Sequence, residues 1–190
     1  MEIKDILIDL QIELDAKRYE HTLSTADMAN KLANYLGYDE NKAYIAGILH
    51  DCAKCLPKEK MFSEVEKYNI KLDKITQNAT QLIHAPLGAL YAKMKYGVND
   101  ESILSAIKYH TTGKVNMSTL DKIIFLADMI EQTRNYDEVD ILRKKAFSNF
   151  DEALIMGFDS TINHVVSSGG LLHTDTVEAR NYLLLDRKCR

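Results

Sequence analysis

The stretch AGILHDCAKC, residues 46–55, runs from small and apolar residues into two pairs of potential metal ligands. His50 is followed directly by Asp51, and Cys52 lies three residues before Cys55. A histidine with a carboxylate is typical of sites that hold divalent cations through nitrogen and oxygen. A Cys-x-x-Cys pair instead indicates zinc binding or redox chemistry. The fold around this stretch decides between the two interpretations.

The residues before His50 predict a helix that packs closely against a neighbour. His50 lies seven residues after Ala43 and three after Gly47, so on a helix these three residues share one face. Because that face consists of small residues, a neighbouring backbone can approach it. His50 would then continue the inner face of this helix.

The rest of the chain also indicates helices. Two prolines and eight glycines are few for 190 residues, and β-branched residues nowhere alternate with polar ones over the length of a strand. Repeats, low-complexity tracts and linkers are absent from the sequence. We therefore predict an all-α fold of about eight to ten helices, with residues 1–190 forming a single domain.

Helix boundaries follow from capping residues. Gly37 after NKLANYL indicates a C-terminus, because glycine adopts the left-handed conformation without strain, and Asp39 can cap the next helix. Ser118 with Asp121 resembles a capping box. Pro57 and Pro86 are each expected in the first turn of a helix, and Thr174 is expected to cap a further helix.

Composition excludes several classes of protein. Apolar content of 46% and charged content of 27% are ordinary for a globular protein, and the net charge of −4 argues against a nucleic-acid-binding surface. No apolar run is long enough to span a bilayer, and the acidic N-terminal segment MEIKDILIDLQIELD does not resemble a signal peptide. We expect a cytoplasmic protein that binds neither nucleic acid nor membrane, with its three cysteines as thiols.

Two residues elsewhere strengthen the His-Asp interpretation. Asp128 is the only charged residue in IIFLADMI, residues 123–130, and a carboxylate on a largely buried helix is unfavourable unless a cation or good donors meet it. His21 accompanies an apolar stripe at helical spacing. A polar helix edge with an ion-paired Asp128, and a solvated helix end at His50 and Asp51, remain the alternatives.

The order of these residues is similar to that of a known family. His21, then His50 with Asp51, then Asp128 resembles the H…HD…D signature of the HD-domain metal-dependent phosphohydrolases. The blocks RYEHTLSTADMANKLA, AGILHDCAK, HAPLGALYAKMKYG, AIKYHTTG, LDKIIFLADMIEQTR and HTDTVEARNYLL resemble the bacterial symmetrical bis(5′-nucleosyl)-tetraphosphatases over nearly the whole chain. One departure is Thr174, where proline is expected.

The resemblance implies a hydrolase that cleaves diadenosine tetraphosphate in the middle, giving two ADP. Its ligands of a first divalent metal would be His21, His50, Asp51 and Asp128. His84 and His110 fall where related enzymes hold a second ion, with Asp51 bridging the two. The resemblance favours iron, and nitrogen with oxygen ligands suit iron or manganese better than magnesium. One or two ions fit the pattern.

Several residues are candidates for catalysis or for contact with the phosphates. Asp51, His84 and His110 are the expected catalytic residues, and the last two are alternatively phosphate donors, a general acid or satisfied helix caps. Without the resemblance, a surface ion pair is the simpler interpretation of each arginine. The expected phosphate-binding residues are Arg18, Lys54, His84, His110, Thr111, Arg134 and Arg180, with Thr112 as a further hydroxyl.

Two alternative functions stay open. Another HD phosphohydrolase, acting on nucleoside monophosphates, triphosphates or cyclic nucleotides, would share the same metal core. A non-catalytic nucleotide or metal sensor is the other. The expected partners are a small-molecule dinucleotide and ADP- or GDP-type products, and a homo-oligomer is compatible with the sequence. Without strands or a second ligand pair, the spacing of Cys52 and Cys55 is incidental. His164 and His173 are mainly structural, and shaping of the nucleotide pocket is the alternative for His173.

Overall fold

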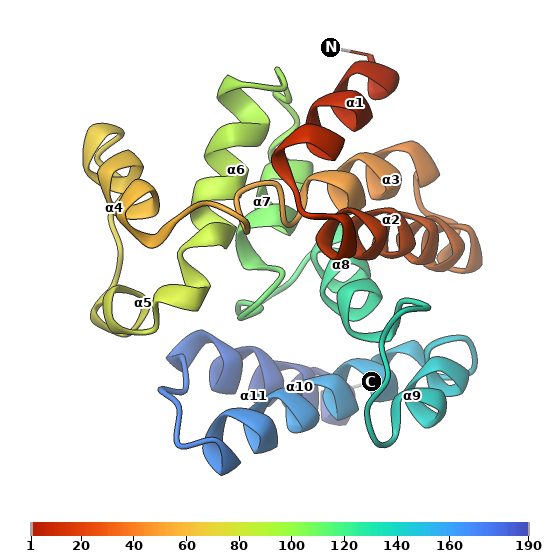
Figure 1. The fold of residues 1–190 in the computed structure, drawn as a ribbon. Coiled ribbons are helices and arrows are strands. Elements are labelled where there is room, and N and C mark those ends of the chain that lie inside the picture. Colours follow the sequence, from red (N-terminus) through yellow and green to blue (C-terminus); the bar gives the residue numbers. More distant parts are fainter. Residues whose placement is uncertain (1, 190) are drawn as a thin grey trace.

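The computed structural model describes residues 2–189, and all regular structure within them is helical (Figure 1). No helix among these residues is long and apolar enough to cross a membrane. The elements are α1 (Ile3–Glu13), α2 (Ala16–Leu36), α3 (Glu40–Leu49), α4 (Lys58–Lys67), α5 (Lys74–Asn78), the 3-10 helix η1 (Thr80–Leu82), α6 (His84–Met94), α7 (Glu101–Tyr109), α8 (Thr119–Ile130), α9 (Val139–Ala146), α10 (Phe150–Ser167) and α11 (Thr174–Cys189).

The all-α prediction is therefore confirmed, and the described residues contain eleven α-helices rather than eight to ten. Gly37 ends α2 in the left-handed conformation, with φ of 66°. Ser118 and Asp121 form both hydrogen bonds of a capping box at the start of α8. Pro86 lies in the first turn of α6, as expected. Pro57 differs, because it precedes α4 as its N-cap instead of occupying the first turn.

The cap of α11 is also different from the expected one. Thr174 is the first residue of the helix, and the ring of His173 takes the capping role by accepting a hydrogen bond from the backbone N–H of Asp175 at 3.1 Å. A backbone N–H can only donate, so the Nδ1 atom of His173 carries no proton.

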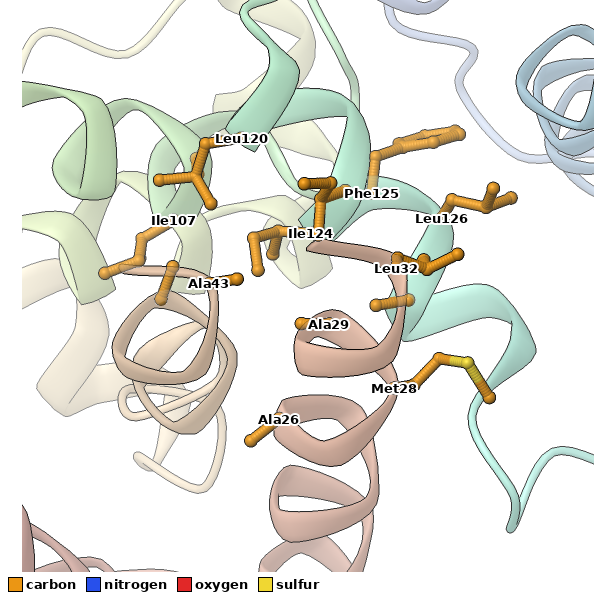
Figure 2. Packing of buried hydrophobic residues seen from close by; sticks show 14 of the residues in the cluster. Ala26, Met28, Ala29, Leu32, Ala43, Ile107, Leu120, Ile124, Phe125 and Leu126 are labelled. Carbon is orange, nitrogen blue, oxygen red and sulfur yellow. The ribbon is translucent and has the colours of Figure 1, made fainter. Parts of the chain in front are cut away.

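Helices α2, α3, α7 and α8 surround the centre of the hydrophobic core. Figure 2 shows the small side chains of Ala26 and Ala29 on α2, with Ile124 of α8 on the side of α2 and α3 and Phe125 on the other side of α8. The backbones of α2 and α3 approach so closely that a Cβ atom on Gly47 would lie 2.6 Å from the Cα atom of Ala26. This contact holds the N-terminal half of α2 against the end of α3.

The C-terminal helices pack beneath α8 in the view of Figure 1. Phe125 of α8 stacks on Phe158 of α10 with ring centroids 4.2 Å apart. The turn after α7 lies against the same ring, since a Cβ on Gly113 would be 2.5 Å from the Cζ atom of Phe158, and Gly113 has φ of +65°. Because only glycine fits there without strain, the turn that carries Thr111 and Thr112 is fixed relative to α10.

Candidate metal centre

Five side chains meet around Asp51, and the six residues come from five helices or their ends. One lies in the second turn of α2, two at the end of α3, one at the start of α6, one at the end of α7 and one on α8. Helix α3 ends at Leu49, and His50 follows as its C-cap in helical conformation and fully buried on the inner face, as expected, with Asp51 in the turn. The structure thus brings together every expected metal ligand: His21, His50, Asp51, His84, His110 and Asp128.

The two carboxylate oxygens of Asp51 face different pairs of histidines. Its Oδ2 atom lies 3.7 Å from the Nε2 atom of His21 and 3.5 Å from that of His50. Its Oδ1 atom lies 3.0 Å from Nε2 of His84 and 3.5 Å from Nε2 of His110. Asp51 therefore offers one carboxylate oxygen to each pair of histidines. All five residues are buried, with exposed fractions of 5% or less.

Asp128 completes the first half of the cluster from α8. Its Oδ1 atom lies 3.0 Å from Nε2 of His21 and 3.8 Å from Nε2 of His50. His21, His50 and the two aspartates therefore offer two nitrogens and two carboxylates around one point. Four ligands of this kind suit a divalent transition metal.

The outward ring nitrogens determine the tautomers of the histidines. The Nδ1 atoms of His50, His84 and His110 lie 2.6–2.7 Å from the carbonyl oxygens of Gly47, Gln81 and Ile107, respectively. A carbonyl accepts and cannot donate, so each Nδ1 carries the proton and each Nε2 keeps a lone pair. In the same way, Nδ1 of His21 lies 3.0 Å from a carboxylate oxygen of Glu131.

These lone pairs explain why the cluster fits a metal. The Nε2 atoms of His21 and His50 are 3.2 Å apart, and those of His84 and His110 are 3.1 Å apart. With both protons on the Nδ1 side, neither contact is a hydrogen bond between neutral rings. The Oδ1 atom of Asp51 is likewise buried without a hydrogen-bond donor. A cation between these atoms satisfies all of them.

The protonation states agree with this arrangement. Burial lowers the pKa of His84 to about 4, which keeps its imidazole neutral near pH 7. The pKa of each of the two carboxyl groups, Asp51 and Asp128, lies well below its ordinary value although burial alone would raise it. The guanidiniums of Arg18 beside Asp51 and of Arg134 beside Asp128 favour the ionised forms. Both carboxylates are therefore ionised and available as ligands.

Basic side chains lie at the rim of the cluster. A guanidinium nitrogen of Arg18 is 2.6 Å from Oδ2 of Asp51, and one of Arg134 is 2.5 Å from Oδ1 of Asp128. The ammonium of Lys54 lies 3.3 Å from both ring nitrogens of His84, and burial lowers its pKa. These three cations lie where phosphate oxygens would approach the cluster.

The remaining phosphate candidates are distributed unevenly. Thr111, next to His110, lines two cavities that open beside the cluster, and Thr112 is buried and donates to the carbonyl of Gly113. Arg180 is not brought to the cluster, because its guanidinium pairs with Asp159 on α10. Thr112 therefore shapes the turn, and Arg180 joins α11 to α10.

Two cavities of similar size open on the arginine side of the cluster. One of about 420 Å³ lies between α8 and α10, with Met129, Tyr136, Thr161 and His164 among its lining residues. The other, of about 460 Å³, is lined by Arg18, His21, Glu131 and Arg134 among others. The first is walled largely by apolar groups and the second by charged ones, so they suit a nucleoside and phosphates, respectively.

Glu131 is a site residue that the sequence interpretation missed. It is fully buried, accepts from the backbone N–H and hydroxyl of Thr133 at 2.6 Å, and orients the ring of His21. Its position three residues after Asp128 was an available signal, since residues at that spacing share a helix face. Glu131 is a positioning residue for a ligand histidine.

The cysteine pair lies outside the cluster. Cys52 is buried against the carbonyl of Gly88, and burial raises the pKa of its thiol to about 12. Cys55 is exposed and approaches Asp15. Within residues 2–189, no potential metal-binding group includes a cysteine. In the HDCAKC segment, the structure therefore favours His50 and Asp51 as the metal-binding pair over the two cysteines.

Comparisons with known proteins agree with the site. Residues 18–133 match the HD domain family. The symmetrical bis(5′-nucleosyl)-tetraphosphatase of Halalkalibacterium halodurans is 38% identical over 92% of this chain and 93% of its own, and that of Bacillus subtilis is 36% identical over 97% and 98%. The crystal structure of a predicted HD superfamily hydrolase involved in NAD metabolism from Clostridium acetobutylicum superposes with a TM-score of 0.94, at 43% identity and 98% coverage of both chains.

Proposed function

The chain belongs to the HD domain family, and on that premise we propose that it hydrolyses diadenosine tetraphosphate symmetrically into two ADP. Its relatives with that activity in their names match it over nearly their full lengths. The observation that carries the proposal is the position of Asp51 between two pairs of histidines whose lone pairs face its two oxygens. A two-ion centre of this kind is suited to an in-line displacement at phosphorus.

We propose that His21, His50, Asp51 and Asp128 hold a first ion and that Asp51, His84 and His110 hold a second, with iron as the native metal. The mixed nitrogen and oxygen donors support a transition metal over magnesium. Divalent ions would supply a water nucleophile of lowered pKa and neutralise phosphate charge. Because Nε2 of His84 and His110 carries no proton, the geometry supports a ligand role over a general-acid role for both.

The protein's own cations would bind and orient the tetraphosphate. Arg134 presents a planar guanidinium at Asp128 and can hold two phosphate oxygens at once, while Lys54 provides a point charge beside His84. Arg18 reaches Oδ2 of Asp51 from the cavity that Arg134 also lines. The cavity between α8 and α10 would hold one nucleoside, since Met129, Tyr136 and Phe125 offer it an apolar surface.

The products of the reaction test this proposal. The protein is purified without oxygen, its metal content is measured, and diadenosine tetraphosphate is supplied. Ion-exchange separation is expected to show two ADP for each substrate consumed. ATP with AMP would show asymmetric cleavage and contradict the proposal. Tight nucleotide binding without turnover in iron, manganese or cobalt would instead favour a sensor.

Glu131 gives a second prediction, about the affinity for metal. Glu131→Ala should weaken metal binding by about 10–100-fold, because the ring of His21 would lose the acceptor that fixes its tautomer. Glu131→Gln is the matched control, since its amide oxygen can still accept from His21. Metal titration of both variants measures the difference. Equal affinities in the alanine variant and the unmodified protein would show that Glu131 does not position His21.

A further inference from the structure

A third cavity, of about 200 Å³, lies on the α6 and α7 side of the cluster. Its lining includes Pro86, two residues after His84, and Thr111, which directly follows His110, so it lies next to the cluster. Thr111 also lines the cavity between α8 and α10, so the two cavities share a wall at the cluster. Thr111 thus places both cavities beside His110, where an extended molecule bound at the cluster would reach them.

The walls of this third cavity suit a nucleoside joined to phosphate. Leu72, Leu82, Pro86 and Tyr109 provide apolar and aromatic surface. Lys71 and Lys108 add two cations, and within residues 2–189 neither forms an ion pair with a carboxylate. Nζ of Lys108 lies over the ring of Tyr109, 5.0 Å from its centroid, so cations and apolar wall lie together and favour an anionic ligand with a flat apolar part.

One wall of the cavity contains a hydrogen-bonded pair, the clasp of His173 and Asp73. Because Nδ1 of His173 accepts from the N–H of Asp175, its Nε2 carries the proton and donates to Oδ2 of Asp73 at 3.0 Å. Asp73 also caps α5 through the backbone N–H groups of Ile75 and Thr76. The clasp thus joins the start of α11 to the start of α5, which lie side by side at the left of Figure 1.

This tautomer separates His173 from the metal centre. The four cluster histidines have the proton on Nδ1 and direct an Nε2 lone pair inward, whereas His173 has the opposite arrangement and a carboxylate partner of its own. The exposed fraction of His173 is 9%, so its side chain forms part of the cavity wall and not of the outer protein surface. His173 therefore fixes the shape of the third cavity and is a positioning residue.

We propose that this third cavity, walled by Leu82, Tyr109 and His173, binds the second nucleoside of the dinucleoside tetraphosphate; this inference rests on the proposed function. The substrate carries two identical nucleosides on either side of the bond that breaks. With the central phosphates at Asp51, the two halves must leave the cluster in different directions. The cavity between α8 and α10 takes one half, and the third cavity takes the other.

Filling the third cavity tests the inference. Leu82 is half-buried on η1, and Leu82→Trp places an indole in the space that the second nucleoside would occupy. The KM for diadenosine tetraphosphate is expected to rise at least about fivefold, the effect of losing one stacked base, with a smaller change in kcat. The Ki of adenosine 5′-tetraphosphate, a competitor with four phosphates and one nucleoside, should stay unchanged, since it can use the other cavity.

Two further variants support the interpretation. Leu171→Trp adds the same bulk on the exposed turn before α11, outside the cavity, and should change neither constant. His173→Asn keeps an acceptor for the N–H of Asp175 but cannot reach Asp73, so it should raise KM without altering the Ki.

The outcomes separate this inference from the proposed function. If the unmodified protein releases two ADP and Leu82→Trp leaves both constants unchanged, or raises both equally, the third cavity does not hold a nucleoside. An unchanged Ki in the variant shows at the same time that the protein is folded and its phosphate site intact. If the unmodified protein does not release two ADP, the proposed function fails first, and the assignment of this cavity fails with it.

Discussion

Asp51→Ala is expected to abolish turnover, with a fall of at least about a thousandfold, because both proposed ions depend on this carboxylate. Its Oδ2 atom faces His21 and His50, and its Oδ1 atom faces His84 and His110. Alanine removes one ligand from each half of the cluster. It also removes the negative charge that lies between the two imidazole pairs, so the metal content should fall together with the activity.

Metal analysis and turnover of diadenosine tetraphosphate measure this effect on the same preparation. Asp9→Ala is a matched control, since Asp9 of α1 pairs with Lys95 and the buried Tyr96, just after α6, and has no contact with the cluster. That variant should keep its metal and its kcat, and lose about 1–3 kcal/mol of stability because the hydroxyl of Tyr96 loses its acceptor. Full metal occupancy with normal turnover in Asp51→Ala would show that the metal centre is assigned to the wrong residues.

The helical class and many helix ends were predictable because their signals are local. A glycine at the end of an apolar stripe, or a serine three residues before an aspartate, acts through the backbone of its own segment. Gly37 and the capping box of Ser118 and Asp121 therefore appear where they were expected. The proximity of His21, His50 and Asp128 is not local, and the family resemblance supplied it.

Other features of the site depend on contacts between distant segments. The ring of His21 is oriented by Glu131, 110 residues later, and the clasp between Asp73 and His173 spans 100 residues. No local pattern specifies such pairs. The tautomers of the histidines also cannot be predicted from the sequence, because each depends on which group lies beside Nδ1. Arg180 illustrates the reverse error, since its motif suggested a phosphate contact and its actual partner is Asp159.

The packing of α2 against α3 leads to the second large effect. Gly47→Ala would place a methyl group 2.6 Å from the Cα atom of Ala26, which is backbone and cannot rotate away. The two helices must therefore separate, at a cost of about 1–3 kcal/mol that exceeds the gain in helix propensity. We expect a lower melting temperature and a lower free energy of unfolding in urea.

The same substitution should also lower the rate of hydrolysis, and this effect should be larger than the loss of stability. His21 lies on α2 and His50 at the end of α3, so separating the helices moves these two ligands apart, and a displacement of about 1 Å can lower a rate by roughly 100-fold. Gly88→Ala is the matched control, because its new methyl group would meet its nearest atoms at 3.5 Å, an ordinary contact. That variant should remain stable and active.

A Gly47→Ala variant that matched Gly88→Ala in melting temperature, metal content and kcat would contradict the link between this helix contact and the metal centre. The expected loss therefore connects a single methyl group on a buried helix face, through the spacing of two histidines, to hydrolysis at the cluster.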